Sequence, residues 1–168
     1  FIHCLTILAS NESQMDDLLL DLYSYYATIG LAQPSPKIRA GSIAVLSCLL
    51  PRAESIVALS LPQLEQSLER ENWWEIHTNI INLCGSFLAL QRPGVSWHDG
   101  SRVTEPGDES IAAGTQAALR ILKSLLQKGV QEDRVSQHLI TWGASCLAPA
   151  LGQSDELNNM FMAILNQV

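Results

Sequence analysis

Hydrophobic and polar residues follow a helical spacing along most of the chain, and residues 61–90 show this pattern best. The stretch LPQLEQSLERENWWEIHTNIINLCGSFLAL is typical of two amphipathic helices joined by a very short turn. Asn72 and Glu75 have the spacing of a capping box at the start of the second helix. The positions predicted to face the core in that helix are large and apolar: Ile76, Ile80, Ile81, Leu83, Cys84, Phe87 and Leu88.

The same spacing predicts helices through the rest of the chain, and no stretch has the period-two alternation of a β-strand. The predicted helices cover residues 1–9, 14–29, 36–50, 52–60, 61–68, 72–90, 108–128, 134–147 and 154–165. The fold class expected from this pattern is therefore all-α.

The predicted helix at residues 14–29 begins at Ser13, which forms a capping box with Asp16. Gly30 is expected to end it as a left-handed cap. The positions that we expect to face the core carry aliphatic and aromatic side chains: Leu18, Leu19, Leu22, Tyr25, Tyr26 and Ile29.

Proline and glycine mark several other helix boundaries. Ser35 and Pro36 are a favourable N-cap and first helical residue. Pro62 either kinks a helix or starts a new one. Gly129 and Pro149 are predicted to end two later helices. Residues 91–107, with two prolines and three glycines, are predicted to form a long loop.

An internal repeat connects three of the predicted helices. Apolar positions at 38, 43, 49 and 50 recur 38 residues later at 76, 81, 87 and 88. They recur again after a further 59 residues at 135, 140, 146 and 147, and the loop at 91–107 accounts for most of the longer interval. A period of about 40 residues built from two helices is typical of helical solenoids, in which each pair covers the apolar face of the next.

The segments that carry this repeat resemble the HEAT family. QPSPKIRAGSIAVLSCLL resembles the turn and second helix of a HEAT unit, with Arg39 at the position of the family's arginine. Residues 61–90 resemble a whole unit. The resemblance covers residues 14–147, and its motifs are shared with armadillo-type proteins. The sequence departs from the family pattern at two places. In the turn, Gln33 or Ser35 stands where the family has Asp. In the two later units, His77 and Ser136 stand where the family has Arg.

Composition narrows the class of partner. The chain has 168 residues, of which 47% are hydrophobic and 16% charged, with a net charge of −7. This length suits a single domain, covering residues 1–168, with a substantial core. The negative charge disfavours nucleic acid, which needs a basic surface. No apolar run is long enough to cross a membrane, and no secretory signal is recognisable. Because the chain opens with Phe1 in an apolar run, we interpret it as part of a longer protein.

The cysteines indicate a reducing environment. Cys4, Cys48, Cys84 and Cys146 are far apart in the sequence, and none has a second cysteine or a histidine at metal-ligand spacing. Buried free thiols are therefore expected, in the cytoplasm or another reducing intracellular compartment. We expect no metal and no cofactor.

Two places in the sequence are candidates for partner binding. The first is Arg70, Trp73 and Trp74, at the turn between the two helices of residues 61–90. The resemblance to HEAT-based microtubule-binding (TOG) domains implies a tubulin site there, whereas packing of Trp74 on Leu64 and Leu68 is the structural alternative. Glu65, Glu69, Glu71 and Glu75 would repel an acidic partner such as tubulin.

The second candidate is the pair Trp97 and His98 in the loop at 91–107. An aromatic residue in a long polar loop either anchors a partner or folds back onto the domain. His98 and Asp99 are too few ligands for a closed zinc site.

No catalytic constellation is recognisable, because the chain lacks the nucleophile, metal-protease and phosphate-loop motifs. His3, His77 and His138 stand singly and are expected at helix surfaces. The sequence therefore predicts an irregular HEAT/armadillo-like α-solenoid of three to four helix pairs, a non-enzymatic scaffold that binds other proteins. A TOG-like tubulin-binding domain and a helical enzyme remain alternatives. The apolar faces at the ends of such a stack would allow homodimerisation.

Overall fold

The computed structural model describes residues 16–71, 74–91, 109–152 and 154–166, and every regular element in these ranges is helical. The predicted helix at 1–9 and the loop at 91–107 lie outside the described residues, apart from Gln91. The elements, in chain order, are α2 (Asp17–Leu31), α3 (Pro36–Leu49), α4 (Glu54–Ser67), η2 (Leu68–Arg70), α5 (Trp74–Leu90), α6 (Glu109–Gln131), α7 (Asp133–His138), η3 (Leu139–Gly143), α8 (Ala144–Leu151) and α9 (Asp155–Leu165).

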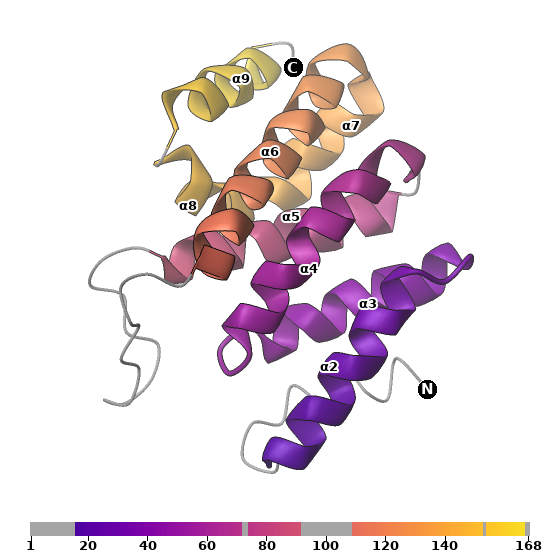
Figure 1. The fold of residues 1–168 in the computed structure, drawn as a ribbon. Helices are drawn as coiled ribbons and strands as arrows, with labels where there is room; N and C mark the ends of the chain where they lie inside the picture. Colours follow the sequence, from indigo (N-terminus) through magenta and orange to yellow (C-terminus); the bar gives the residue numbers. More distant parts are fainter. Residues whose placement is uncertain (1–15, 72–73, 92–108, 153, 167–168) are drawn as a thin grey trace.

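Alternate helices along the chain lie side by side (Figure 1). On one side of the molecule α3 packs on α5 and α5 packs on α8, while on the other α4 packs on α6 and α6 packs on α9. The helix α2 packs almost entirely on α3 and has little contact with α4. The prediction of an all-α fold is confirmed for the described residues.

The helices α3 and α5 form the central part of the core. Ser35 and Pro36 occupy the N-cap and first helical position of α3, as predicted. Ile43, Leu46 and Leu49 of α3 are almost fully buried, and every residue predicted to face inward in α5 is buried. A single Asn79 side chain also joins the two helices, because its amide donates to the carbonyl oxygen of Ala40 at 2.9 Å.

The helices α4 and α6 approach each other unusually closely. A Cβ atom added to Gly114 of α6 would lie 2.8 Å from Cβ and 2.9 Å from Cα of Ala58 in α4. Only glycine allows the two backbones to come this near. Pro62 lies inside α4, so it neither starts a new helix nor ends the existing one.

Three predicted helix ends are wrong. Gly30 and Gly129 lie inside α2 and α6, where they permit close packing and do not adopt a left-handed conformation. A Cβ on Gly30 would meet Ser42, and one on Gly129 would meet Leu139 and Ile164. Pro149 lies within α8 rather than ending it.

The predicted helix at 134–147 is also more irregular than its sequence suggests. It is divided into α7, the π-helical segment η3 and α8. A π-helical segment inserts extra backbone into a turn and shifts the faces of the helix that follows. At the start of α9, Ser154 is the N-cap, because its hydroxyl accepts from the amide of Leu157 at 3.4 Å.

The largest error concerns the orientation of α2. Asp16 is itself the N-cap, and its carboxylate accepts from the amide of Leu19 at 2.9 Å. Of the six side chains predicted to face the core, only Leu19 packs against it in the described structure, and the other five are 42–77% exposed. The five exposed ones are Leu18, Leu22, Tyr25, Tyr26 and Ile29. The residues that pack inward are Tyr23, Ala27 and Leu31.

The buried cysteine of α5 gives a prediction on stability at alkaline pH. Cys84 is fully buried, and its burial raises the pKa of the thiol far above the ordinary value. The raised pKa means that the thiol ionises in the unfolded chain before it ionises in the folded one. The free energy of unfolding is therefore unaffected below about pH 8 and falls as the pH rises above about 9.

Urea unfolding at pH 7, 9 and 10 measures this loss, which we expect to be on the order of 1 kcal/mol by pH 10. The contribution of the Cys84 thiol is the part of the loss that disappears in Cys84→Val. An equal alkaline loss in the variant and the parent chain would contradict the prediction.

Candidate interaction site at the turn between α4 and α5

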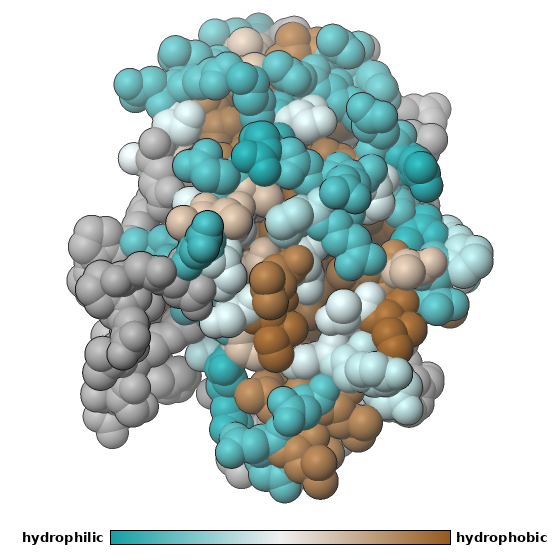
Figure 2. All heavy atoms as spheres, viewed as in Figure 1, coloured by the Kyte–Doolittle hydropathy of each residue, from teal (hydrophilic) through white to brown (hydrophobic). Residues whose placement is uncertain are grey.

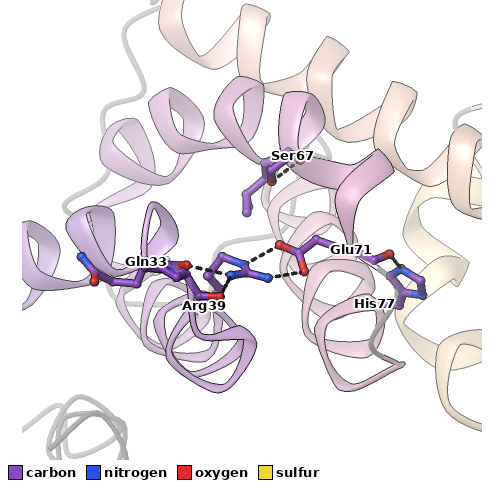
Figure 3. Close-up of polar contacts among 7 residues, drawn as sticks. Gln33, Arg39, Ser67, Glu71 and His77 are labelled. Carbon is purple, nitrogen blue, oxygen red and sulfur yellow. Dashed lines mark hydrogen bonds and ion pairs between the residues drawn. The ribbon is translucent and has the colours of Figure 1, made fainter.

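The turn between α4 and α5 is tied to the turn between α2 and α3 by one arginine. Arg39, in the first turn of α3, donates from Nε and Nη2 to the two carboxylate oxygens of Glu71, at 2.5 and 2.8 Å. Its third nitrogen, Nη1, donates to the carbonyl oxygens of Gln33 and Pro34, each at 2.7 Å. All three guanidinium nitrogens are therefore engaged, and the two turns are held side by side (Figure 3).

The Arg39–Glu71 pair is largely shielded from water. The side chain of Glu71 is only 5% exposed and that of Arg39 is 19% exposed. Hydrogen bonding to Glu71 raises the pKa of Arg39, so the guanidinium stays charged throughout the accessible pH range. A planar arginine fork matches both oxygens of a carboxylate, which fixes the geometry as well as the distance.

The backbone of this turn is held by a second buried polar group. His77, in the first part of α5, is buried, and its Nε2 lies 2.7 Å from the carbonyl oxygen of Glu71. The expectation that His77 lies at a helix surface is therefore wrong. Ser67 ends α4 with a hydroxyl that donates to the carbonyl oxygen of Leu64 at 3.0 Å. Glu71 is thus held from α3 through its carboxylate and from α5 through its carbonyl oxygen (Figure 3).

Only part of the predicted partner-binding cluster can be placed. Arg70 is exposed in η2, directly before the buried Glu71. Trp74 begins α5, but its side chain is outside the described part of the chain, as is all of Trp73. The other candidates, Trp97 and His98, also lie outside the described residues.

The pairing of Glu71 with Arg39 was not predicted from the sequence. Glu71 was treated there only as a source of negative charge. A signal was present in the predicted repeat. Arg39, His77 and Ser136 occupy the same position of the three aligned helices, and the last two are buried. A polar residue that recurs at one position of a repeat and is repeatedly buried needs a partner in or near the adjoining turn.

This arrangement provides a rigid edge with exposed charge, and its buried groups are engaged with one another. Arg39 uses its nitrogens on the protein itself, so it supports the turn rather than offering a reactive group. Within the described ranges, no group of three or more His, Cys, Asp or Glu side chains could hold a metal ion.

Comparison of the chain with protein-family models, with curated proteins and with solved structures found no match. None of the helices in the described part of the chain is both long and apolar enough to cross a membrane.

Proposed function

We propose that this chain is a non-enzymatic protein–protein interaction scaffold, built as an irregular HEAT/armadillo-like α-solenoid within a larger intracellular protein. The observation that carries the proposal is a repeated pattern of burial. Five positions of α3, its C-cap residue Leu50 and the six positions 38 residues later in α5 are all buried; the pairs are Ser42 and Ile80, Ile43 and Ile81, Val45 and Leu83, Leu46 and Cys84, Leu49 and Phe87, and Leu50 and Leu88.

The way the helices pack also supports a solenoid. In a stack of helix pairs each helix contacts its counterpart in the next pair, which lies two helices further along the chain. Contacts between α3 and α5 and between α4 and α6 have this relationship. The contact between α5 and α8 has it as well when α7, η3 and α8 are counted as the single helix predicted at 134–147. The proposed solenoid is irregular for two reasons. The segment η3 is π-helical, and α2 has little contact with α4.

In this proposal binding takes place along the edge formed by the turns, with Arg70 as a contact residue. The Arg39–Glu71 pair holds two adjacent turns in a fixed relation before any partner arrives, which lowers the entropic cost of binding. The opposite edge is fixed as well, because the Gln91 amide at the end of α5 donates to the carboxylate of the buried Glu54 in α4. The mechanism is shape and charge complementarity without a covalent step.

The test is affinity capture from cells with the chain as bait, followed by the same capture with Arg70→Ala. We expect a specific partner to be retained by the parent chain and reduced at least about tenfold by the variant, the loss expected for a charged contact residue. Arg52→Ala is the matched control, because Arg52 is also an exposed arginine but lies between α3 and α4, at the opposite end of α4. Equal capture by both variants would exclude the edge that contains Arg70.

A TOG-like tubulin-binding domain is the second candidate, favoured by the exposed position of Arg70 in a turn between two paired helices. Co-sedimentation with microtubules distinguishes it from the general scaffold. Binding that is lost in both Arg70→Ala and Trp73→Ala supports the tubulin-binding domain. The absence of co-sedimentation at micromolar tubulin excludes it and leaves the scaffold proposal intact.

A further inference from the structure

The helix α2 has two apolar faces on opposite sides. One face, with Tyr23, Ala27 and Leu31, is buried, and α3 is the helix that α2 mainly contacts. Leu18, Leu22, Tyr25 and Ile29 follow one another at intervals of four, three and four residues, and at 100° per residue they lie on the side opposite to the buried face. A helix that is apolar on two sides is normally covered on both.

The outward face is large and strongly exposed. Leu18 is 77% exposed and Tyr25 62%, and the other members of the face, Leu22, Tyr26 and Ile29, are each more than 40% exposed. Together these five residues define the α2 face. The rings of Tyr25 and Tyr26 pack edge to face with their centroids 5.6 Å apart, which restricts their freedom before any contact is made. In Figure 2 apolar residues gather on the surface over the region of α2.

The spacing of the residues in the α2 face indicates which kind of element would cover it. Intervals of four and three are those of a coiled-coil seam, which is filled by another helix. The order four, three, four also reads the same in both directions. Two copies of α2 related by a two-fold axis and running antiparallel would therefore place Leu18 against Ile29 of the second copy and Leu22 against its Tyr25. A surface that is complementary to itself is what a two-fold dimer requires.

The charges on α2 favour the same arrangement. Asp16, Asp17 and Asp21 are exposed at its N-terminal end, and α2 contains no lysine or arginine. In a parallel pair these carboxylates would face one another. In an antiparallel pair they lie at opposite ends of the contact, next to the uncharged second half of the other helix, so the repulsion between them is small.

The area of the α2 face indicates a weak complex. Five large side chains at these exposures make an apolar patch on the order of 500 Å², the size of the largest patch on a typical monomer. Two such patches bury about 1,000 Å² in all, close to the lower limit for a specific interface. A dimer that dissociates in the micromolar range or above is the expected result.

We propose that the α2 face is a homodimerisation surface, on which α2 of a second copy of this chain packs antiparallel across a two-fold axis. This surface is separate from the edge that contains Arg70 and does not depend on the proposed scaffold function. Occupation by a different protein, or by another segment of the same chain, would leave the isolated chain monomeric.

Sedimentation equilibrium on the full chain tests the proposal, with protein concentrations from about 1 µM to 1 mM. We expect a concentration-dependent monomer–dimer equilibrium for the parent chain. The double substitution Leu18→Gln with Tyr25→Gln should weaken the dimer at least about tenfold, because it removes the two most exposed apolar contacts. Met162→Gln is the matched control, since Met162 is 47% exposed on α9 at the far end of the molecule (Figure 1).

Disulfide cross-linking tests the direction of the helices. An equimolar mixture of Leu18→Cys and Ile29→Cys should form a cross-link between residues 18 and 29 of different copies, identified by peptide mapping. Leu18→Cys alone should form none through residue 18, because the two cysteines would lie about 16 Å apart, at 1.5 Å per residue. This arm uses single substitutions at exposed positions, so it remains decisive if the double variant does not fold.

A chain that is monomeric at 1 mM overturns the proposal, and so does a dimer that the double substitution leaves unchanged. A cross-link between two copies of Leu18→Cys alone overturns the antiparallel arrangement. Affinity capture with the double variant separates this inference from the scaffold function. Partners bound through the edge that contains Arg70 should be retained when the dimer is lost.

Discussion

Replacing Arg39 by alanine is expected to lower the free energy of unfolding by about 2–4 kcal/mol, because it leaves a buried carboxylate without its partner. Glu71 is 5% exposed and receives two hydrogen bonds from the guanidinium. The carbonyl oxygens of Gln33 and Pro34 lose a donor in the same variant. Urea unfolding at pH 7, followed by circular dichroism, measures the change.

The chain contains a well-matched control for this prediction. Arg120 donates from Nε and Nη2 to both carboxylate oxygens of Glu65, at 2.6 and 2.9 Å, so the geometry is nearly the same. That pair, however, is 55% and 30% exposed. Because water screens exposed charges, Arg120→Ala should cost no more than about 1 kcal/mol. Similar losses in the two variants would show that the burial of Glu71 contributes nothing.

A double-mutant cycle isolates the Arg39–Glu71 interaction itself. If the cost of Arg39→Ala arises mainly from the unpaired carboxylate, then replacing Glu71 by leucine as well should recover much of the lost stability. A double variant that is as unstable as the sum of the two single variants would place the cost elsewhere, for example in the packing of the arginine stem.

The core of α5 could be predicted from the sequence because that helix is central. It is covered by α3, by α6 and by α8, so nearly all its large apolar residues are inside, and any reading of its pattern finds the right ones. For α2 the pattern of apolar residues is compatible with two orientations of the helix. Both of its faces carry apolar side chains, and the sequence does not say which one meets α3. The prediction selected the face that proved to be exposed.

The glycines were misread for a related reason. A glycine near the end of a helical pattern is usually a left-handed cap, and Gly30 and Gly129 have that position in the sequence. Their actual role depends on residues that are distant in the chain, such as Ser42 beside Gly30 and Ile164 beside Gly129. Close approach between helices is a tertiary property, so periodicity within one helix cannot reveal it.

One part of the candidate site could be predicted from the sequence, and the other part could not. The resemblance to HEAT units singled out Arg39, and the turn containing Arg70 was placed correctly between two helices. The partner of Arg39 lies 32 residues away in the next turn, and no local pattern connects the two. Recognising Glu71 requires knowing that successive turns lie side by side, which becomes evident only when the helices are packed.

Substituting leucine for Gly114 is expected to destabilise the protein by about 3 kcal/mol or more, because the new side chain would enter the contact between α4 and α6. Even the first added atom would lie 2.9 Å from the Cα of Ala58, a backbone atom that cannot move aside without shifting α4. Ala113→Leu is the control. Ala113 is the adjacent residue of the same helix and is exposed, so its substitution should change the free energy of unfolding by less than about 0.5 kcal/mol.

Gly114→Ala then separates the clash from the intrinsic helical preference of alanine. In an unobstructed helix this change stabilises by up to about 1 kcal/mol, so a net loss of stability in α6 measures the overlap with Ala58. Adding Ala58→Gly removes the nearest obstructing atom, the Cβ of Ala58, while leaving the backbone in place. The double variant should therefore recover part of the loss, beyond the sum of the separate effects. If the effects of Gly114→Ala and Ala58→Gly on the free energy of unfolding were simply additive, α4 and α6 would not be in close contact at this point. The scaffold proposal rests on the packing of alternate helices, and it would then lose its best-defined contact.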